Sequence, residues 1–335
     1  MTDTWPAGAQ VETRPAPIWV LADPRAGTAA QALGIAERLG QPFRTVTLEW
    51  SPLARLPWPL PTLAGLTPRA REALGTEVPA LVLSAGRRSA PVALWLRRRG
   101  ARVVHCMRPG FAAGQFDRLV LGRHDLPAKS GWPSNVVPVL GATHRISPER
   151  LLRERAAHEA LSALPGPRTV LLLGGPVRGE GMVPAEAAAI AGRLAAEARA
   201  SGGSVLASTS RRTGDAAAAA VAAALGNTPG RLFRWGEAGP NPFAGFLAWA
   251  DRIVVTGDSV SMISEALATT APVFVARAGG ARRHARLHRT LFEAGQARPF
   301  DGDLSPFDRA PLDESARVAA LLVQAGLVPT GAAAG

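Results

Sequence analysis

Short apolar runs alternate with longer segments of helical periodicity along most of the chain. Continuous apolar runs are typical of parallel strands that are buried on both faces, and a helix between two of them completes a βαβ unit. In the first half the pattern predicts strands at Ile18–Ala22, Arg44–Leu48, Ala80–Ser84, Arg102–Met107 and Arg118–Leu121. It also predicts helices at Thr28–Leu39 and Pro91–Arg99.

The second half repeats this pattern. A predicted helix, Pro148–Leu164, leads through Pro165-Gly166-Pro167 into a new series of strands and helices. The predicted strands are Thr169–Leu173, Ser204–Ser208, Arg231–Trp235, Arg252–Thr256 and Ala271–Ala276, and the predicted helices are Pro184–Ala200, Asp215–Leu225 and Ser259–Thr269. Two consecutive series of βα units favour two doubly wound domains over a single closed (β/α)₈ barrel.

Length and composition agree with two domains. A chain of 335 residues, 47% of them apolar, is long enough for two cores. We therefore expect an N-terminal Rossmann-like domain at 17–147 and a C-terminal one at 148–327. Disordered tails are expected at 1–16 and 328–335, where few apolar residues are available for packing.

The net charge of +12 favours an anionic partner. Nearly all basic residues are arginines, with Lys129 the only lysine, a bias that indicates a bacterial genome with GC-rich codons. A positive field suits a phosphorylated small molecule, an anionic membrane surface or nucleic acid. Because no nucleic-acid-binding module is recognisable, nucleic acid is not expected as a partner.

Cysteine and histidine usage predicts neither a disulfide nor a bound metal. Cys106 is the only cysteine, and the histidines lack the spacing of a metal site. His284 and His288, four residues apart, are expected on a solvated helix face. With no secretory signal and no apolar stretch of membrane-spanning length, we expect a cytoplasmic protein.

Two predicted strand ends in the second half carry residues suited to an anion. Gly174 and Gly175 follow the strand Thr169–Leu173, where glycines let the backbone approach a ligand. Ser210, Arg211 and Arg212 follow the next strand, and guanidinium groups bind phosphate oxygens through paired hydrogen bonds. The alternatives are a flexible turn and a solvated turn without ligands.

A third strand end is more distinctive. Asp258, Ser259 and Ser261 come between the strand Arg252–Thr256 and the body of the following helix, and Glu265 lies on its first turns. Serine hydroxyls beside free helix amides suit an anionic ligand. The alternative is that Asp258 or Ser259 is only the N-cap of an ordinary helix.

Strand ends in the first half supply candidates for catalysis. Asp23 follows the first strand, where a carboxylate can act as a general base, with Arg25 beside it. Alternatively, Asp23 accepts a hydrogen bond from its own turn. Gly86 and Arg87 follow a neighbouring strand and are the expected acceptor-side residues.

An apolar loop between the first strands has two interpretations. Its large apolar residues lie among prolines: Trp50, Leu53, Leu56, Trp58, Leu60 and Leu63. They can contact a membrane interface next to the basic run Arg97–Arg99. Alternatively, the loop packs on its own domain.

Five segments, in order, resemble the mitochondrial-fission Elm (elongated mitochondria) family, which includes plant proteins and many bacterial ones. They are WVLADPRAGTAAQALGIAERLG, SAGRRSAPVALWL, LLLGGP, STSRRT and NPFAGFLAWADRIVVTGDSVSMISEALATTAPVFV. The sequence departs from the expected family pattern at Pro24, in place of glycine, and at Thr28, in place of asparagine. The family is distantly similar to GT-B glycosyltransferases, so the resemblance implies two Rossmann-like domains that face each other across a cleft.

The resemblance also implies roles for the candidate residues. Gly174 and Gly175, with Ser210 and Arg211 beside them, would face the diphosphate of a nucleotide-sugar. Ser259 and Ser261 would reach the donor phosphates, and Glu265 would bind the ribose. Asp23 would be the base on the acceptor side. No metal or other cofactor is implied, because GT-B enzymes generally need none.

Three functions follow as alternatives. The first is a nucleotide-sugar-dependent glycosyltransferase that acts on an envelope glycan or lipid, peripherally at the inner membrane face. The second, implied by the resemblance to the plant relatives, is a non-catalytic scaffold that recruits a protein partner. The third, a sugar-nucleotide epimerase, would need a dinucleotide fingerprint or a pair of carboxylates, and neither is evident in the sequence.

Overall fold

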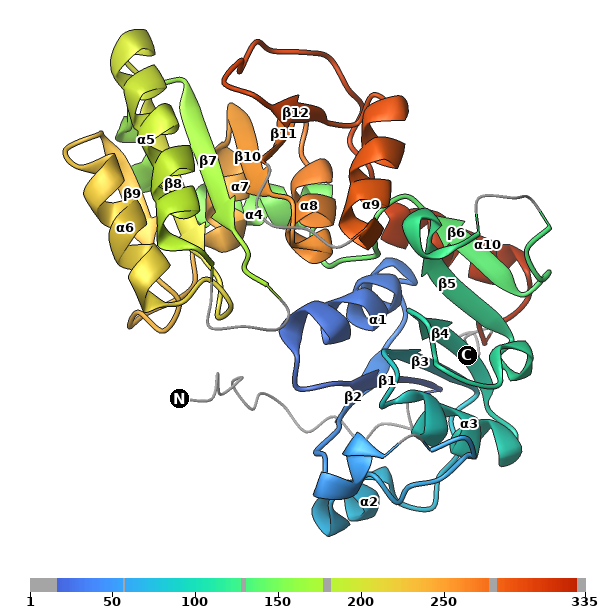
Figure 1. Ribbon diagram of the computed structural model, residues 1–335. Helices are drawn as coiled ribbons and strands as arrows, with labels where there is room; N and C mark the ends of the chain where they lie inside the picture. Colours follow the sequence, from blue (N-terminus) through green and yellow to red (C-terminus); the bar gives the residue numbers. More distant parts are fainter. Residues whose placement is uncertain (1–16, 57, 128–130, 177–181, 277–281, 330–335) are drawn as a thin grey trace.

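Two parallel six-stranded sheets form the framework of the computed structural model, which describes residues 17–56, 58–127, 131–176, 182–276 and 282–329. The first sheet has the strand order β2-β1-β3-β4-β5-β6 (Figure 1). Its strands are β1 (Ile18–Ala22), β2 (Phe43–Thr47), β3 (Leu81–Ala85), β4 (Arg102–Cys106), β5 (Arg118–Gly122) and β6 (Val136–Val139).

The second sheet has the order β12-β11-β10-β7-β8-β9. Its strands are β7 (Arg168–Leu173), β8 (Ser204–Thr209), β9 (Gly230–Phe233), β10 (Arg252–Thr256), β11 (Val273–Ala276) and β12 (Arg298–Phe300). The strands thus divide between the sheets on either side of residue 148. In both sheets the carboxyl ends of neighbouring strands meet at one edge, because all strand pairs are parallel.

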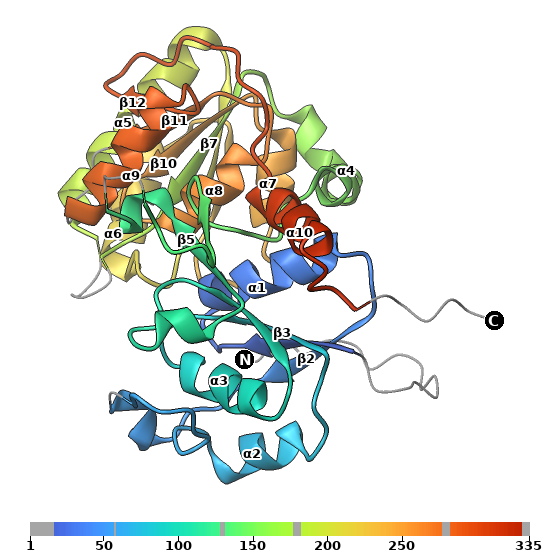
Figure 2. The same cartoon turned by 90° about the vertical axis from the view of Figure 1, so that its right-hand side faces the viewer.

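Helices cover both faces of the first sheet. On one face α1 (Ala26–Arg38) lies between the sheet and the second half of the protein (Figure 1). On the other face lie α2 (Pro68–Leu74) and α3 (Ala90–Arg98), as the turned view shows (Figure 2).

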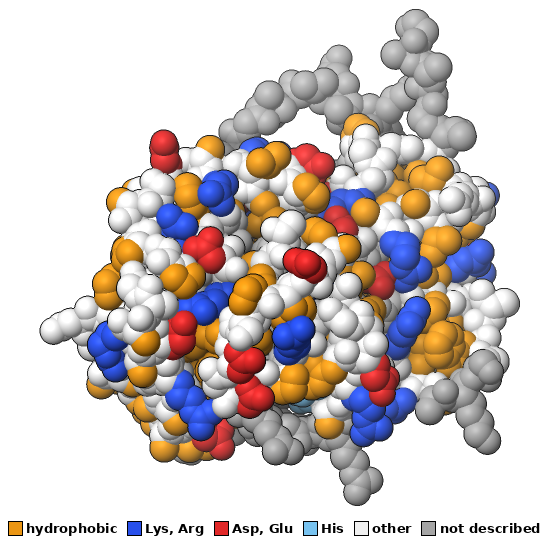
Figure 3. All heavy atoms as spheres, turned by 90° about the horizontal axis from the view of Figure 1, so that it is seen from above, with side chains coloured by type: hydrophobic (Ala, Val, Ile, Leu, Met, Phe, Trp, Pro, Cys, Tyr) orange, Lys and Arg blue, Asp and Glu red, His pale blue; other side chains and the backbone are white. Residues whose placement is uncertain are grey.

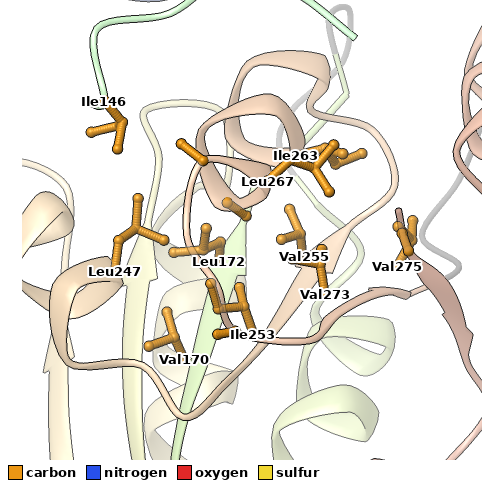
Figure 4. Close-up of a cluster of buried hydrophobic side chains, with 14 of the residues drawn as sticks. Ile146, Val170, Leu172, Leu247, Ile253, Val255, Ile263, Leu267, Val273 and Val275 are labelled. Atoms are coloured by element: carbon orange, nitrogen blue, oxygen red, sulfur yellow. The ribbon is translucent and has the colours of Figure 1, made fainter. Parts of the chain in front are cut away.

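Alternate residues of the second sheet face two separate cores. Val170, Leu172, Ile253 and Val255 pack against α7 (Phe243–Trp249), α8 (Val260–Leu267) and α9 (Arg282–Glu293), with α4 (Pro148–Ala157) beside them (Figure 4). The intervening residues pack against α5 (Pro184–Ser201) and α6 (Asp215–Leu225). The central strands β7, β8, β10 and β11 are therefore buried on both faces, which is why each is a largely apolar run in the sequence, whereas the edge strands β9 and β12 are partly exposed.

The last helix returns to the first half. α10 (Glu314–Gln324) packs against α1, and its Val318, Ala319 and Leu322 join the core of the first sheet. The helix therefore packs on the first half, whereas the sequence predicted that residues 148–327 form one C-terminal domain. Val328, expected in a disordered tail, also packs on this core, and the Pro329 carbonyl accepts a hydrogen bond from Gln41 at 3.1 Å. Residues 1–16 and 330–335 lie outside the described residues.

Polar contacts fasten α10 to the segment that joins the halves. The Ser315 hydroxyl donates to the His144 carbonyl at 2.7 Å and accepts from the His144 N–H at 2.8 Å. Arg38 of α1 forms an ion pair with Asp313 at 3.0 Å. The connection between the halves is thereby held by both α1 and the end of the chain.

Some elements differ from the sequence predictions. α1 begins at Ala26, two residues earlier than expected, and the expected helix 148–164 ends at Ala157 and continues as a short 3₁₀ helix, Glu159–Ala163. Strands β6 and β12 were not predicted. No helix among the described residues is both long enough and apolar enough to cross a membrane.

Candidate functional site

Three strands of the second sheet bring their carboxyl ends together at the candidate donor site. The Gly174 N–H, after β7, donates to the Thr256 hydroxyl at the end of β10 over 2.8 Å. That hydroxyl donates to the Asp258 carboxylate over 2.7 Å. The β7 loop and the β10 turn therefore form one hydrogen-bonded unit, and Gly174 leaves room for the adjacent Asp258 and Ser259 side chains.

The loop after β8 supports the glycine loop from the other side. The Ser210 hydroxyl donates to the Gly174 carbonyl at 2.8 Å, and the Arg212 guanidinium donates to the Gly175 carbonyl. Gly175 has a φ of +145°, which L side chains rarely adopt. Ser210 and Arg212 thus hold the backbone of the loop, whereas Arg211 has an exposed side chain that is available to a ligand.

The β10 turn leads directly into α8. Ser259 is the N-cap of this helix, and its hydroxyl accepts from the Met262 N–H at 3.5 Å. The side chains of Asp258 and Ser259 are both buried. The predicted N-cap is therefore present, and the first-turn amides of α8 lie beside the glycine loop, where a helix N-terminus favours an anion.

Glu265 lies one turn further along α8 and is half-buried. Burial raises the pKa of its carboxyl group to about 7, and the nearby Arg150 opposes this shift. Within the described part of the chain, no group makes a hydrogen bond to the Glu265 carboxyl. The Glu265 carboxyl group therefore has a pKa near neutral pH and no fixed polar partner among the described residues.

Two histidines of α9, His284 and His288, lie near the same edge, whereas the sequence predicted only a solvated helix face for them. His288 Nε2 and the Gly257 carbonyl are 2.7 Å apart, a hydrogen bond that corrects the expected solvated position of this side chain. Burial lowers the pKa of His288, while the Gly257 hydrogen bond and the Asp258 carboxylate oppose the shift. Burial and the Arg283 charge also lower the pKa of His284.

Asp23 lies at the corresponding edge of the first sheet. Its carboxylate accepts from the Arg25 N–H at 2.9 Å, the Trp50 indole N–H at 3.0 Å and the Arg88 guanidinium at 3.0 Å. The bond from the Arg25 N–H lies within the turn, as expected if Asp23 is a turn residue rather than a catalytic base. Arg88 and Trp50 were missed because they are distant from Asp23 in sequence. The Arg25 side chain is exposed.

Gly86 and Arg87 follow β3 at this edge. Gly86 has a φ of +86°, and a Cβ there would be 2.9 Å from the Thr28 methyl group. The exposed Arg87 side chain lines a pocket together with Trp50 and Arg88. The acceptor-side candidates and Asp23 are therefore neighbours along one edge.

Contacts between the halves bring the two edges together. A Cβ at Gly27, in the first turn of α1, would be 3.0 Å from the Ser261 hydroxyl oxygen of α8. The Ala142 N–H donates to the Ser264 hydroxyl at 2.9 Å. On α9, Arg283 pairs with Asp125 at 2.7 Å. Ser261 thus faces the first half rather than the glycine loop.

The positive charge is dispersed on the face that Figure 3 shows. Arginines there lie among acidic and apolar side chains and form no single continuous basic patch. Among the described residues, no group of three or more His, Cys, Asp and Glu side chains is placed to hold a metal ion. The candidate site therefore consists of local arginines, amides and hydroxyls at the two strand edges.

Known structures with this arrangement define the class. A UDP-GlcNAc 2-epimerase from Methanocaldococcus jannaschii superimposes with a TM-score of 0.54 at 13% identity, covering 92% of this chain and 99% of that one. Os79 from O. sativa, in complex with UDP, gives 0.55 at 13% identity, covering 92% and 91%. The fold is the GT-B type, with two Rossmann-like halves, which confirms the predicted fold class.

Sequence comparison identifies the family. The family described as "Mitochondrial fission ELM1" matches residues 26–325, and the chain belongs to it. The Mitochondrial fission protein ELM1 of Arabidopsis thaliana is 31% identical over 282 residues, which are 76% of this chain and 66% of the plant protein. An uncharacterized protein of Rickettsia prowazekii is 32% identical over 116 residues, 32% of each chain. The chain therefore spans only part of the length of these relatives.

Proposed function

We propose that the protein is a glycosyltransferase that uses a nucleotide-sugar donor, with a cell-envelope glycan or lipid as acceptor, in the bacterial cytoplasm at the inner face of the membrane. The donor would bind at the edge of the second sheet and the acceptor at the edge of the first. The observation that carries the proposal is the glycine loop held against the N-terminus of α8 by Thr256 and Ser210.

This arrangement suits a diphosphate. Gly174 and Gly175 let the loop lie directly against Asp258 and Arg212, since a Cβ at either position would collide with them. The adjacent amides of α8 favour negative charge. Arg211 adds an exposed guanidinium, which can pair with two phosphate oxygens. The UDP in Os79 and the UDP-GlcNAc in the Neisseria meningitidis epimerase, which has a TM-score of 0.53, support this ligand class for the same fold.

Glu265 suits the ribose. An ionised carboxylate accepts hydrogen bonds from two hydroxyls, and this carboxyl is half-buried without a fixed partner among the described residues. Because burial raises its pKa to about 7, ribose hydroxyls would favour the ionised form and ligand binding would lower that pKa.

The proposed reaction is a displacement at the anomeric carbon. An acceptor oxygen forms a bond to that carbon as the bond to the diphosphate oxygen breaks, and the nucleoside diphosphate leaves with the electron pair. A hydroxyl acceptor also loses its proton to a base. The α8 N-terminus and Arg211 would stabilise the charge of the leaving group.

The occupied carboxylate of Asp23 favours a second candidate, a GT-B scaffold that recruits a protein partner. Three N–H groups already donate to this carboxylate, and one belongs to the Arg88 guanidinium. A carboxylate held in this way must give up a hydrogen bond before it can take a proton from an acceptor hydroxyl. The general-base role of Asp23 stays a prediction.

Nucleotide binding distinguishes the two candidates. Calorimetric titrations and thermal-shift assays would use UDP, GDP, CMP, dTDP and their sugars, where a ligand at 100 times its Kd stabilises by about 2.7 kcal/mol. One class should bind, and Arg211→Ala and Glu265→Ala should each weaken it. Arg199→Ala, an exposed arginine at the end of α5, is the matched control. No binding across the panel, with one stoichiometric protein partner captured, would support the scaffold.

A further inference from the structure

A pocket lies at the carboxyl edge of the first sheet, directly beside Asp23. Three connections line it: the segment between β2 and α2, the start of α3, and the loop after β4. The lining residues that matter most here are Trp50, Leu56, Trp58, Arg87, Pro91 and Phe111.

The tryptophans present only their apolar ring surfaces to the pocket. The Trp50 indole N–H donates to Asp23, and the Trp58 indole N–H donates to the Leu53 carbonyl at 2.8 Å. With both polar groups already satisfied, the rings offer carbon to a ligand. Leu56, Pro91 and Phe111 extend this apolar wall.

The pocket wall is fixed by backbone hydrogen bonds. The Thr62 N–H donates to the Pro91 carbonyl at 3.1 Å, which ties the β2–α2 segment to the start of α3. The Ser51 N–H donates to the Gly65 carbonyl at 2.9 Å and closes the base of the segment. The pocket is therefore formed before any ligand arrives, which lowers the entropic cost of binding.

The two arginines of the pocket differ in charge balance. Arg88 is neutralised by Asp23 at 3.0 Å, and its guanidinium lies 5.0 Å from the centre of the Trp50 ring. Arg87 is exposed, and its stem rests on Gly110, where a Cβ would be 3.0 Å from the Arg87 Cδ. No carboxylate among the described residues forms an ion pair with Arg87, so one uncompensated positive charge stands at the rim.

Apolar side chains continue outward from the pocket. Leu53, Leu56 and Leu60 are 46%, 53% and 61% exposed, and all three belong to the segment that forms the pocket wall. A small polar ligand would leave this surface in water. A long apolar chain would cover it, at a gain of roughly 25 cal/mol per Å² of apolar surface buried.

We propose that this pocket binds one molecule of a long-chain amphiphile with a phosphate head. The chain lies against Trp50, Trp58 and Leu56, and the phosphate pairs with Arg87. Resting on the proposed function, this inference names the acceptor class: a lipid-linked phosphate presented at the edge that faces the donor site. The apolar chain of such a molecule matches the apolar wall of the pocket, and its phosphate matches the unpaired Arg87 guanidinium.

The test is a calorimetric titration of the full chain with dodecyl phosphate below its micelle concentration, without nucleotide. We expect saturable binding of one molecule per chain, with dodecanol and inorganic phosphate each binding at least tenfold more weakly. Arg87→Gln should weaken binding about tenfold, the value of roughly one charge-assisted pair. Leu56→Ser should also weaken it severalfold.

Two matched variants serve as controls. Arg98→Gln makes the same charge change at the exposed C-terminal end of α3, away from the pocket at its N-terminal end. Leu152→Ser makes the same apolar-to-polar change on α4 of the other half, at a leucine that is 70% exposed and does not line the pocket. Both should bind dodecyl phosphate like the unmodified protein, and circular dichroism should show all four variants folded.

Other outcomes overturn the proposal. Equal weakening by Arg87→Gln and Arg98→Gln would indicate a general charge effect. Binding to anionic phosphatidylglycerol vesicles without binding to monomeric dodecyl phosphate would indicate a surface that docks on membranes. Because nucleotide is absent, failure here leaves the donor-site proposal standing, and failure of nucleotide binding leaves this site to be judged by its own titration.

Discussion

Ser261 of α8 lies against Gly27 of α1, so that the first turn of a helix in one half contacts the first turn of a helix in the other. A Cβ at residue 27 would be 3.0 Å from the Ser261 hydroxyl oxygen, which is tighter than an ordinary van der Waals contact. The carboxyl edges of the two sheets can therefore approach each other this closely only because residue 27 has no side chain.

A larger residue at this contact should destabilise the protein. Gly27→Leu inserts a side chain between α1 and α8, and overpacking of this kind costs about 1–3 kcal/mol. Ala26→Leu, on the neighbouring exposed position of the same turn, should change the free energy of unfolding by less than about 0.5 kcal/mol. Urea unfolding measures both, and equal effects would contradict the contact.

Glu265 should make stability depend on pH. Its pKa is raised by burial to about 7, so the folded protein keeps the proton over a range in which the unfolded chain has lost it. The contribution of Glu265 to the free energy of unfolding is fully present below about pH 4.5. It is lost as the pH rises through about 7.

The variant Glu265→Gln removes this dependence. At pH 8 it should be about 1–3 kcal/mol more stable than the unmodified protein, and at pH 4 the two should be equal. Denaturant unfolding at the two pH values measures the difference. A constant difference at both would show that the carboxyl does not titrate in this range.

The α10 helix should stabilise the first half. Leu322 is buried in the core of the first sheet, and Leu322→Ala should cost about 2–5 kcal/mol. The adjacent Leu321 is 37% exposed, and Leu321→Ala should cost much less. If the two variants unfolded at the same urea concentration, the packing of α10 on this core would be refuted.

The Asp23–Arg88 pair should show energetic coupling. Asp23→Asn and Arg88→Met each leave the other residue without its charged partner, so each should destabilise the protein. The double variant should cost less than the sum, with a coupling free energy of about 0.5–3 kcal/mol. Additive costs, measured by the same unfolding assay, would show that the 3.0 Å contact contributes no stability of its own.

Most central elements of the fold were predictable because buried parallel strands are continuous apolar runs. Ile18–Ala22 was predicted with the bounds that β1 has in the structure. β6 and β12 were not predicted because each is a short edge strand that contains a proline, Pro138 in β6 and Pro299 in β12. Proline is tolerated there since an edge strand has N–H groups without a ladder partner, but it removes the sequence signal.

The candidate site was predictable only in part. Strand ends are local in sequence, so the glycine loop and the Ser259 N-cap were recognised. The partners of Asp23 were not, since Trp50 and Arg88 are 27 and 65 residues away from it. The polar role of His288 depends on a backbone carbonyl, Gly257, on another element, which no side-chain motif reveals.

The position of α10 has a consequence during synthesis. The first half lacks Val318, Ala319 and Leu322 until the ribosome has added about 180 residues beyond the first sheet. At a translation rate of roughly 5–20 residues per second, this interval is on the order of 10–35 seconds. Throughout that time the apolar face that α10 covers is exposed, so the nascent first half can bind chaperones or aggregate before α10 is synthesised.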